Sequence, residues 1–145
     1  NILRSLHVSA LAFFLFSYHV HEKGILVPLY PLLPLSLAER DYAAAFSLLS
    51  AFTLLPLLHY EGLALAYGAS VALYGLAWYD HKPRRAFAAF AGLVPLHFMP
   101  LVVPPPARYP DLYPALVALL GAAGFGLAYA AVALHELKPW RHKLD

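Results

Sequence analysis

Apolar residues dominate the chain in six successive segments, and a short polar break follows each of them. A transmembrane helix needs about 20 predominantly apolar residues, and most of the segments approach that length. The pattern therefore predicts an all-α fold, a polytopic transmembrane helical bundle of about six spans. The breaks are too short to hold a separate soluble domain, so we expect residues 1–145 to form one transmembrane region. The six segments are Ser5–Ser17, Gly24–Ala38, Tyr42–Leu58, Leu63–Tyr79, Ala86–Val103 and Leu112–Leu134.

The second segment differs from the others because Pro28, Pro31 and Pro34 recur at every third residue. A proline lacks the amide N–H and its ring clashes with the carbonyl group four residues earlier, so we expect a bent or broken helix here. Irregular backbone at membrane depth is tolerated only where protein or a water-filled cavity satisfies its hydrogen bonds. We therefore expect this segment to line a cavity.

Composition supports the membrane class and excludes several others. Of the residues, 61% are hydrophobic and only 12% are charged, about half the charged share of a typical soluble domain. The absence of cysteine from the sequence excludes disulfides, thiolate metal sites and cysteine nucleophiles. No basic stripe with interleaved aromatic residues is present, so no nucleic-acid partner is expected. The chain opens at Asn1 without the features of a signal peptide, and we interpret it as a fragment.

The distribution of Lys and Arg predicts which side of the membrane each break faces. If the six segments alternate across the bilayer, Lys23 and Arg108 lie on one side and the other eight basic residues lie on the opposite side. By the positive-inside rule the side with eight is cytoplasmic. The cytoplasmic set is Arg4, Arg40, Lys82, Arg84, Arg85, Lys138, Arg141 and Lys143. The break Tyr18–Lys23 is then expected on the luminal or extracellular side.

That break gathers four ionisable side chains into six residues, Tyr-His-Val-His-Glu-Lys. A charged side chain at mid-bilayer costs about 2.5–3.5 kcal/mol on insertion scales, so such a cluster beside apolar spans is a candidate functional site. On a helix His19 and Lys23 would share a face, whereas an extended backbone would align His19, His21 and Lys23. The His-x-His pair lacks the spacing of the HExxH metal motif, and no metal is expected. An ordinary hydrated loop is the alternative.

The cluster lies within a longer stretch that resembles a known family. Leu11–Leu26 is similar to the Phe-Leu-Phe-Ser-Phe-(Gln/His)-Val-His-Glu-Lys-x-(Ile/Val)-Leu segment of the endoplasmic-reticulum dolichyl-phosphate-glucose α-1,3-glucosyltransferases. The segments Phe52–Leu58 and Pro104–Leu112 also resemble that family. The resemblance implies the C-terminal part of a GT-C glycosyltransferase, a multi-pass protein of the endoplasmic reticulum membrane whose active face is luminal.

The resemblance also implies a reaction. The family transfers glucose from dolichyl-phosphate-glucose to a dolichyl-diphosphate-linked oligosaccharide with inversion at the anomeric carbon. Inversion implies a single displacement, which needs a base for the acceptor hydroxyl and positive charge or hydrogen-bond donors for the departing phosphate. The family's base is expected upstream of Asn1, so we expect no catalytic residue in this chain and no activity from it alone. No cofactor is expected.

What the chain can supply is substrate binding by the cluster. We assign Lys23 as the cation for the phosphate, His21 as a hydrogen-bond donor, and Glu22 as an acceptor for glucose hydroxyls or an orienter of a neighbour. His19 belongs to the same candidate binding set, although the family also has Gln at its position. Besides both lipid-linked substrates, membrane lipid is an expected partner.

Two sister enzymes share this pattern, one adding the first glucose and one adding the second. Phe16-Ser17-Tyr18 and Pro110–Leu112 favour the first-glucose enzyme, whereas His19 and the short connection between the spans also suit the second. We favour the first. A multi-span transporter fragment with an intramembrane His/Glu site is the alternative from another class, although no inverted repeat supports it.

The remaining polar and small residues have less specific interpretations. His59 and Glu61 either frame an acceptor channel or belong to a solvated loop, and His97 either faces a lipid groove or is a satisfied interior histidine. The segment Lys138–Lys143 is expected to be a cytoplasmic flank that contacts anionic lipid. The small residues of Gly121–Gly124 are expected to let helices approach closely.

Overall fold

The computed structural model describes residues 2–18, 21–78 and 102–141, together with positions 88, 90–93, 95, 96 and 99, and gives the backbone alone at residues 22 and 136–141. Every regular element within these described residues is a helix, which confirms the all-α prediction. In chain order the elements are α1 (Ile2–Phe16), the 3-10 turn η1 (Glu22–Ile25), α2 (Leu26–Leu35), α3 (Arg40–Tyr60), α4 (Ala64–Ala77) and α6 (Leu112–Arg141).

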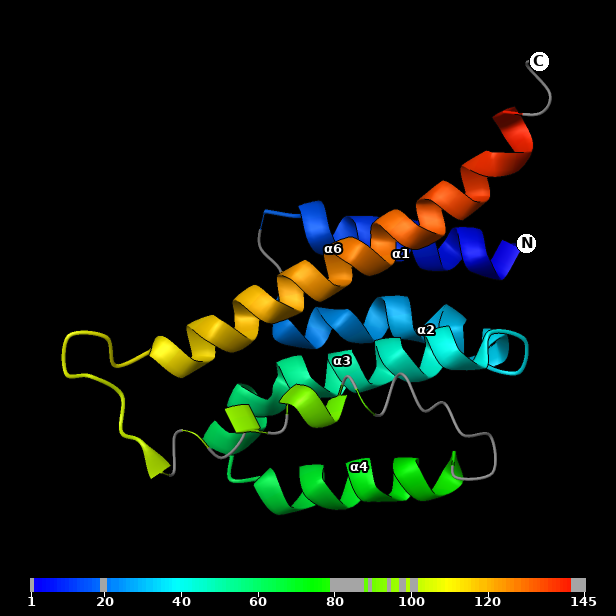
Figure 1. Ribbon diagram of the computed structural model, residues 1–145. Helices are drawn as coiled ribbons and strands as arrows, with labels where there is room; N and C mark the ends of the chain where they lie inside the picture. The colour runs from blue at the N-terminus through cyan, green and yellow to red at the C-terminus, as the bar shows by residue number, and fades with distance from the viewer. Residues whose placement is uncertain are drawn as a thin grey trace.

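Successive helices alternate in direction between two ends of the molecule, at the left and right of Figure 1. At one end α1 finishes, η1 and α2 begin, α3 finishes, and α4 and α6 begin. We call the cluster Tyr18–Lys23 the motif, and this end the motif end, because it carries Lys23. At the opposite end lie the start of α1, the turn between α2 and α3, and the last part of α6. The predicted alternation of the segments is therefore present among these helices.

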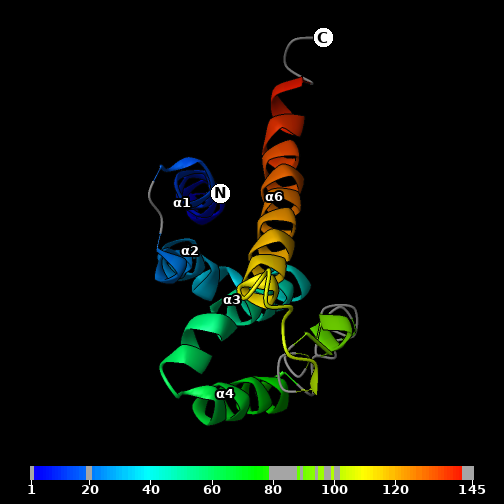
Figure 2. The same ribbon diagram turned by 90° about the vertical axis from the view of Figure 1, so that its left-hand side faces the viewer.

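Helix α3 occupies the middle of the bundle. It packs against α2 and α6 on one side and against α4 on the other, while α1 packs against α2 and α6. Figure 2 shows the same order from a second direction, with α3 between α4 and the pair formed by α1 and α2. No residue of α4 is fully buried, so this helix is the most peripheral of the elements with defined bounds.

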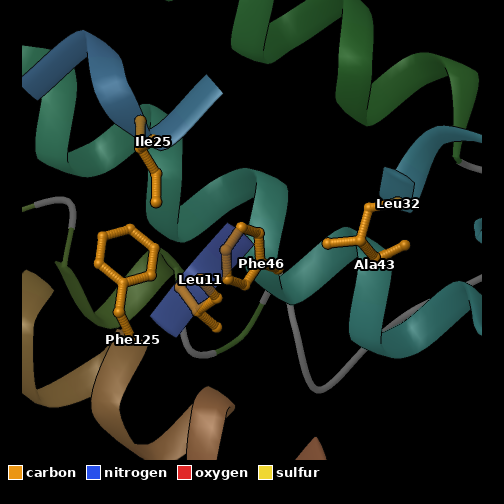
Figure 3. Packing of buried hydrophobic residues seen from close by; sticks show 6 residues of the cluster. All are labelled: Leu11, Ile25, Leu32, Ala43, Phe46 and Phe125. Carbon is orange, nitrogen blue, oxygen red and sulfur yellow. The ribbon is translucent and has the colours of Figure 1, made fainter. Parts of the chain in front are cut away.

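The core lies where α1, η1, α2, α3 and α6 converge (Figure 3). Leu11 and Ile25 are fully buried, and Phe46 and Phe125 approach each other with ring centroids 5.3 Å apart. Between membrane helices such side chains contribute through close van der Waals packing. The cluster consists of Leu11, Ile25, Leu32, Ala43, Phe46 and Phe125, one or two from each element. The segment that follows the motif is thus attached to the core through Ile25.

Within the described part of the chain, two helices are long and apolar enough to cross a membrane by length and composition, α3 and residues Leu112–His135 of α6. The apolar helices Ile2–Phe16, Lys23–Leu35 and Ala64–Ala77 are shorter. Large apolar side chains face outward, for example Leu127 with 73% of its surface exposed, as expected where lipid rather than water covers a helix. The predicted fifth span is described only in part and has no helix bounds, so the number of six spans stays a prediction.

The predicted break in the proline-rich segment is wrong for the ten residues Leu26–Leu35, which form an α-helix that contains Pro31 and Pro34. Pro28 falls in the first turn, where the amide N–H has no helical partner in any case. Pro28, Leu32 and Leu35 are buried, and this packing offsets the hydrogen bonds that the two later prolines remove. The carbonyl oxygen of Pro28 is hydrogen-bonded to His7, and the cavity expected along this segment stays a prediction.

Candidate functional site

The motif is the connection between α1 and η1 at the motif end. Ser17, Tyr18 and His21 lie outside any helix, and His21 has extended backbone angles, φ −68° and ψ 146°. The amide of Gly24 donates a hydrogen bond of 2.7 Å to the carbonyl oxygen of His21, which starts the 3-10 turn. The sequence left helix and extended chain open, and the described residues favour an extended connection that tightens at Lys23.

The side chains of the motif that the structure describes point to the exterior of the protein. Tyr18, His21 and Lys23 are all exposed. His19 lies outside the described residues, and so does the side chain of Glu22. Of the four predicted binding residues, the structure therefore brings His21 and Lys23 to the same surface at the motif end.

Lys23 forms an ion pair with Glu61 at the end of α3. Lys23 Nζ and Glu61 Oε1 are 3.3 Å apart, and the side chains are 63% and 37% exposed. Gly62, at a φ of 73°, lets the chain turn after Glu61 toward α4. An ion pair this exposed is worth about 0–1 kcal/mol. A phosphate group, a stronger acceptor for an ammonium, can therefore replace Glu61 at small cost.

Two largely apolar cavities of similar size open at the motif end. One, of about 310 Å³, lies between α1, α3 and α6 and has His21 in its lining together with Thr53, Pro56 and Gly121. The other, of about 300 Å³, is lined by His59 and Tyr60 of α3 and by Pro105, Pro110 and Tyr113. These volumes are at the lower limit for small-molecule sites. Lys23 lines neither cavity, whereas each cavity has one imidazole, His21 or His59, among largely apolar side chains.

His59 and Glu61 thus belong to the same end as the motif, as the sequence predicted for the side opposite the eight basic residues. Both residues are exposed; His59 contributes to a cavity lining and Glu61 to an ion pair. His97 lies outside the described residues, and so do the side chains of Lys138–Lys143. Among the described residues, no three His, Cys, Asp or Glu side chains gather as metal ligands would.

Sequence reasoning missed a polar cluster at the opposite end. Glu39 accepts hydrogen bonds from the guanidinium group of Arg4, one of them from Nε at 2.9 Å. Arg4 Nη1 also lies 3.0 Å from His135 Nδ1 on α6. The cluster borders an open hollow of about 810 Å³. In the sequence these residues are single charges at the ends of segments. Such charges predict a side of the membrane but not which side chains pair.

Sequence reasoning also passed over His7, which is buried in the bundle. Its ring lies within hydrogen-bonding distance of the Pro28 carbonyl oxygen and of the Tyr42 hydroxyl, 2.7 Å in each case. It also meets the Phe46 ring edge-to-face, with centroids 4.9 Å apart. A lone histidine inside an apolar segment was the available signal.

Comparison with known proteins identifies what the chain is similar to. The model of the ALG6, ALG8 glycosyltransferase family matches residues 1–132. No solved structure matches the chain.

The curated relatives point in the same direction. A Schizosaccharomyces pombe protein named "Probable dolichyl pyrophosphate Man9GlcNAc2 alpha-1,3-glucosyltransferase" is 34% identical over 81% of the chain and 25% of its own length. A Drosophila melanogaster protein of the same name is 30% identical over 89% of the chain and 30% of its own length. The Gallus gallus "Dolichyl pyrophosphate Man9GlcNAc2 alpha-1,3-glucosyltransferase" is 31% identical over 80% and 30%. The chain thus spans between a quarter and a third of the length of these relatives.

Proposed function

The chain belongs to the ALG6, ALG8 glycosyltransferase family, and from this membership we propose that the enzyme carrying it transfers glucose from dolichyl-phosphate-glucose to a lipid-linked oligomannose in the endoplasmic reticulum membrane. The product would be an α-1,3 linkage formed with inversion. The family match over residues 1–132 is the observation that carries the proposal. The long, outwardly apolar helices α3 and α6 support a membrane enzyme.

We favour addition of the first glucose over addition of the second. The relatives from S. pombe, D. melanogaster and G. gallus all have Man9GlcNAc2, an oligosaccharide without glucose, in their names. An enzyme acting on that oligosaccharide adds the first glucose. The names state no glucose donor, and dolichyl-phosphate-glucose follows from the resemblance of the motif.

The motif end offers a binding site for the departing phosphate. Breaking the glucosyl–phosphate bond leaves negative charge on the phosphate oxygens of dolichyl phosphate, and preorganised donors stabilise charge that develops there. Lys23 supplies a point charge and three N–H donors, and the exposed His21 supplies an imidazole. The apolar cavity that His21 borders is suited to the beginning of a hydrocarbon chain. Glu22 and His19 complete the proposed binding set.

The acceptor hydroxyl needs a base, which the resemblance assigns to a part of the enzyme outside these residues. No carboxylate of the motif end is proposed for this role. We further propose that the motif end faces the lumen. The eight-to-two division of Lys and Arg supports this orientation.

The test is glucose transfer by the purified whole enzyme in detergent or liposomes. The enzyme would receive dolichyl-phosphate-glucose and, in parallel reactions, a lipid-linked Man9GlcNAc2 acceptor and the same acceptor already carrying one glucose. We expect product only from the first acceptor. Product only from the second would assign the second-glucose reaction, and no product from either, in a correctly folded preparation, would overturn the proposal.

A further inference from the structure

The buried histidine of α1 links three helices through both nitrogens of its ring. His7 is 1% exposed. Its Nδ1 is 2.7 Å from the carbonyl oxygen of Pro28 on α2, and its Nε2 is 2.7 Å from the hydroxyl oxygen of Tyr42 on α3. A buried polar side chain costs little stability when each of its polar atoms is hydrogen-bonded. Removal of one partner leaves a buried nitrogen without a hydrogen bond.

The two partners determine which nitrogen carries the proton. A carbonyl oxygen can only accept, so Nδ1–H of His7 donates to Pro28. The neutral ring then has a lone pair on Nε2, which accepts the hydroxyl proton of Tyr42. His7 therefore donates one hydrogen bond, to Pro28 of α2, and accepts the other, from Tyr42 of α3.

The bond to Pro28 acts on the segment that carries the motif. From Glu22 to Leu35 the backbone is helical without interruption, through η1 and α2. Pro28 follows Lys23 by five residues, which is about 8 Å along a helix axis. The buried Ile25 fixes the same segment to the core between them. No break in the helical backbone separates Pro28 from Lys23, so the hold on Pro28 and the burial of Ile25 together constrain where Lys23 lies.

We propose that His7 is a positioning residue, which holds α2 through the Pro28 carbonyl and so places Lys23 for the departing phosphate. The proposal rests on the phosphate-binding role proposed for Lys23. His7 itself touches no substrate in this account and takes part in no proton transfer. Misplacement of a positioning element by about 1 Å can cost about 10²-fold in rate, so the effect on catalysis should exceed the effect on stability.

Two amide substitutions separate the two hydrogen bonds of His7. In His7→Asn the side-chain nitrogen occupies the position of Nδ1 and can still donate to Pro28, while the bond to Tyr42 is lost. In His7→Gln the amide oxygen reaches the position of Nε2 and can accept from Tyr42, while the bond to Pro28 is lost. Each variant loses one hydrogen bond, so a purely structural role predicts similar effects of the two.

The first measurement is steady-state glucose transfer by the whole enzyme at matched protein levels, with kcat and the KM for dolichyl-phosphate-glucose resolved. We expect His7→Gln to lose about 10- to 100-fold in kcat/KM, and His7→Asn and Tyr42→Phe to keep most of it. Ser50→Ala is the matched control, because Ser50 is equally buried and its hydroxyl donates to the Phe46 carbonyl within its own helix at 2.8 Å. Equal losses in both His7 variants, or losses that follow the melting temperature, would overturn the proposal.

The second measurement reports the position of Lys23 without catalysis. Residues 1–145 contain no cysteine, so in a whole enzyme whose other cysteines have been replaced, Lys23→Cys combined with Glu61→Cys forms a defined pair for a short bifunctional thiol reagent. In this background His7→Gln should slow cross-linking and His7→Asn should not. Unchanged cross-linking in His7→Gln would overturn the positioning role. Slowed cross-linking together with normal transfer in the enzyme that retains Lys23 would instead remove the proposed phosphate role of Lys23.

Discussion

At the scale of single residues, the phosphate binding proposed for the motif end depends on Lys23 and the side chains beside it. Lys23 faces outward, pairs with Glu61 at 3.3 Å and lies two residues after the exposed His21. His19, by contrast, is a position at which the resembled family also has Gln. A residue that can be replaced by an amide does not need charge or acid–base chemistry, so the three positions should respond differently to substitution.

We predict that Lys23→Ala and His21→Ala each lower glucose transfer by the whole enzyme by about 10²–10³-fold, the usual cost of removing a preorganised donor. His19→Gln should retain most of the transfer. Lys23→Arg should recover only part of it, because a planar guanidinium is not a point charge. The measurement is the rate of lipid-linked product formation at matched protein levels. An inactive His19→Gln enzyme beside a nearly normal Lys23→Ala enzyme would contradict the assignment.

Glu61 is expected to compete with the phosphate for Lys23. Glu61→Gln should therefore lower the KM for dolichyl-phosphate-glucose, while it changes the free energy of unfolding by only about 0–1 kcal/mol, as for other exposed ion pairs. Thermal melting and donor titration measure the two quantities. In an enzyme that already carries Lys23→Ala the substitution should leave the KM unchanged, because the competition no longer exists. A raised KM in Glu61→Gln alone would show that Glu61 assists donor binding.

At the scale of helices, the small residues of α6 have different roles that the sequence alone does not separate. A Cβ atom on Gly121 would overlap Thr53 Cγ2 of α3, and one on Gly124 would lie 2.7 Å from Leu49 Cδ2. A Cβ atom on Gly126 meets nothing within 4 Å. The close approach of α6 to α3, beside the cavity that His21 borders, thus depends on Gly121 and Gly124.

We predict that Gly121→Ala destabilises the protein by about 1–3 kcal/mol through overpacking. Thr53→Ser in the same chain should restore much of the loss, because it removes the methyl group that clashes and keeps the hydroxyl that donates to the Ser50 carbonyl at 2.9 Å. Thermal unfolding in detergent is the measurement, with Gly126→Ala as the control that should not destabilise. Equal losses in Gly121→Ala and Gly126→Ala would contradict this account, because Gly→Ala within a helix otherwise gains helix propensity and of the two only Gly121 lies against α3.

At the scale of the whole molecule, the two ends of the bundle agree with the sides predicted from charge. Lys23 and Glu61 meet at the motif end, and Arg4, Glu39 and His135 meet at the opposite end. The helices therefore alternate as a polytopic protein requires. Which end faces the lumen is the proposal that remains to be measured.

We predict that an N-glycosylation acceptor inserted in the Pro104–Asp111 loop of the whole enzyme is modified, and that one inserted in the Asp80–Arg85 loop is not. The positive-inside rule places the loop with more Lys and Arg in the cytoplasm, and glycosylation takes place only in the lumen. The shift of the protein on a gel before and after glycosidase treatment gives the result. Modification in the second loop alone would reverse the proposed orientation.

Much of the fold and the family follows from local features of the sequence. The length and apolar character of Tyr42–Leu58 and Leu112–Leu134 predicted α3 and α6 to within two residues at the ends of α3 and at the start of α6, because a lipid-facing helix needs only a continuous apolar run. The Tyr18–Lys23 motif pointed to the family that the comparison with residues 1–132 then identified. Composition predicted a membrane protein, and the distribution of Lys and Arg predicted its topology.

Only the tertiary structure decided which residues meet. Lys23 and Glu61 are 38 residues apart, His7 and Pro28 are 21 apart, and Arg4 and His135 are 131 apart. No local pattern encodes such pairs, because they depend on how apolar helix surfaces pack. Leu26–Leu35 is helical despite its prolines, and the packing of Pro28, Leu32 and Leu35 against other helices supports it, whereas the prolines alone predicted a bent or broken helix.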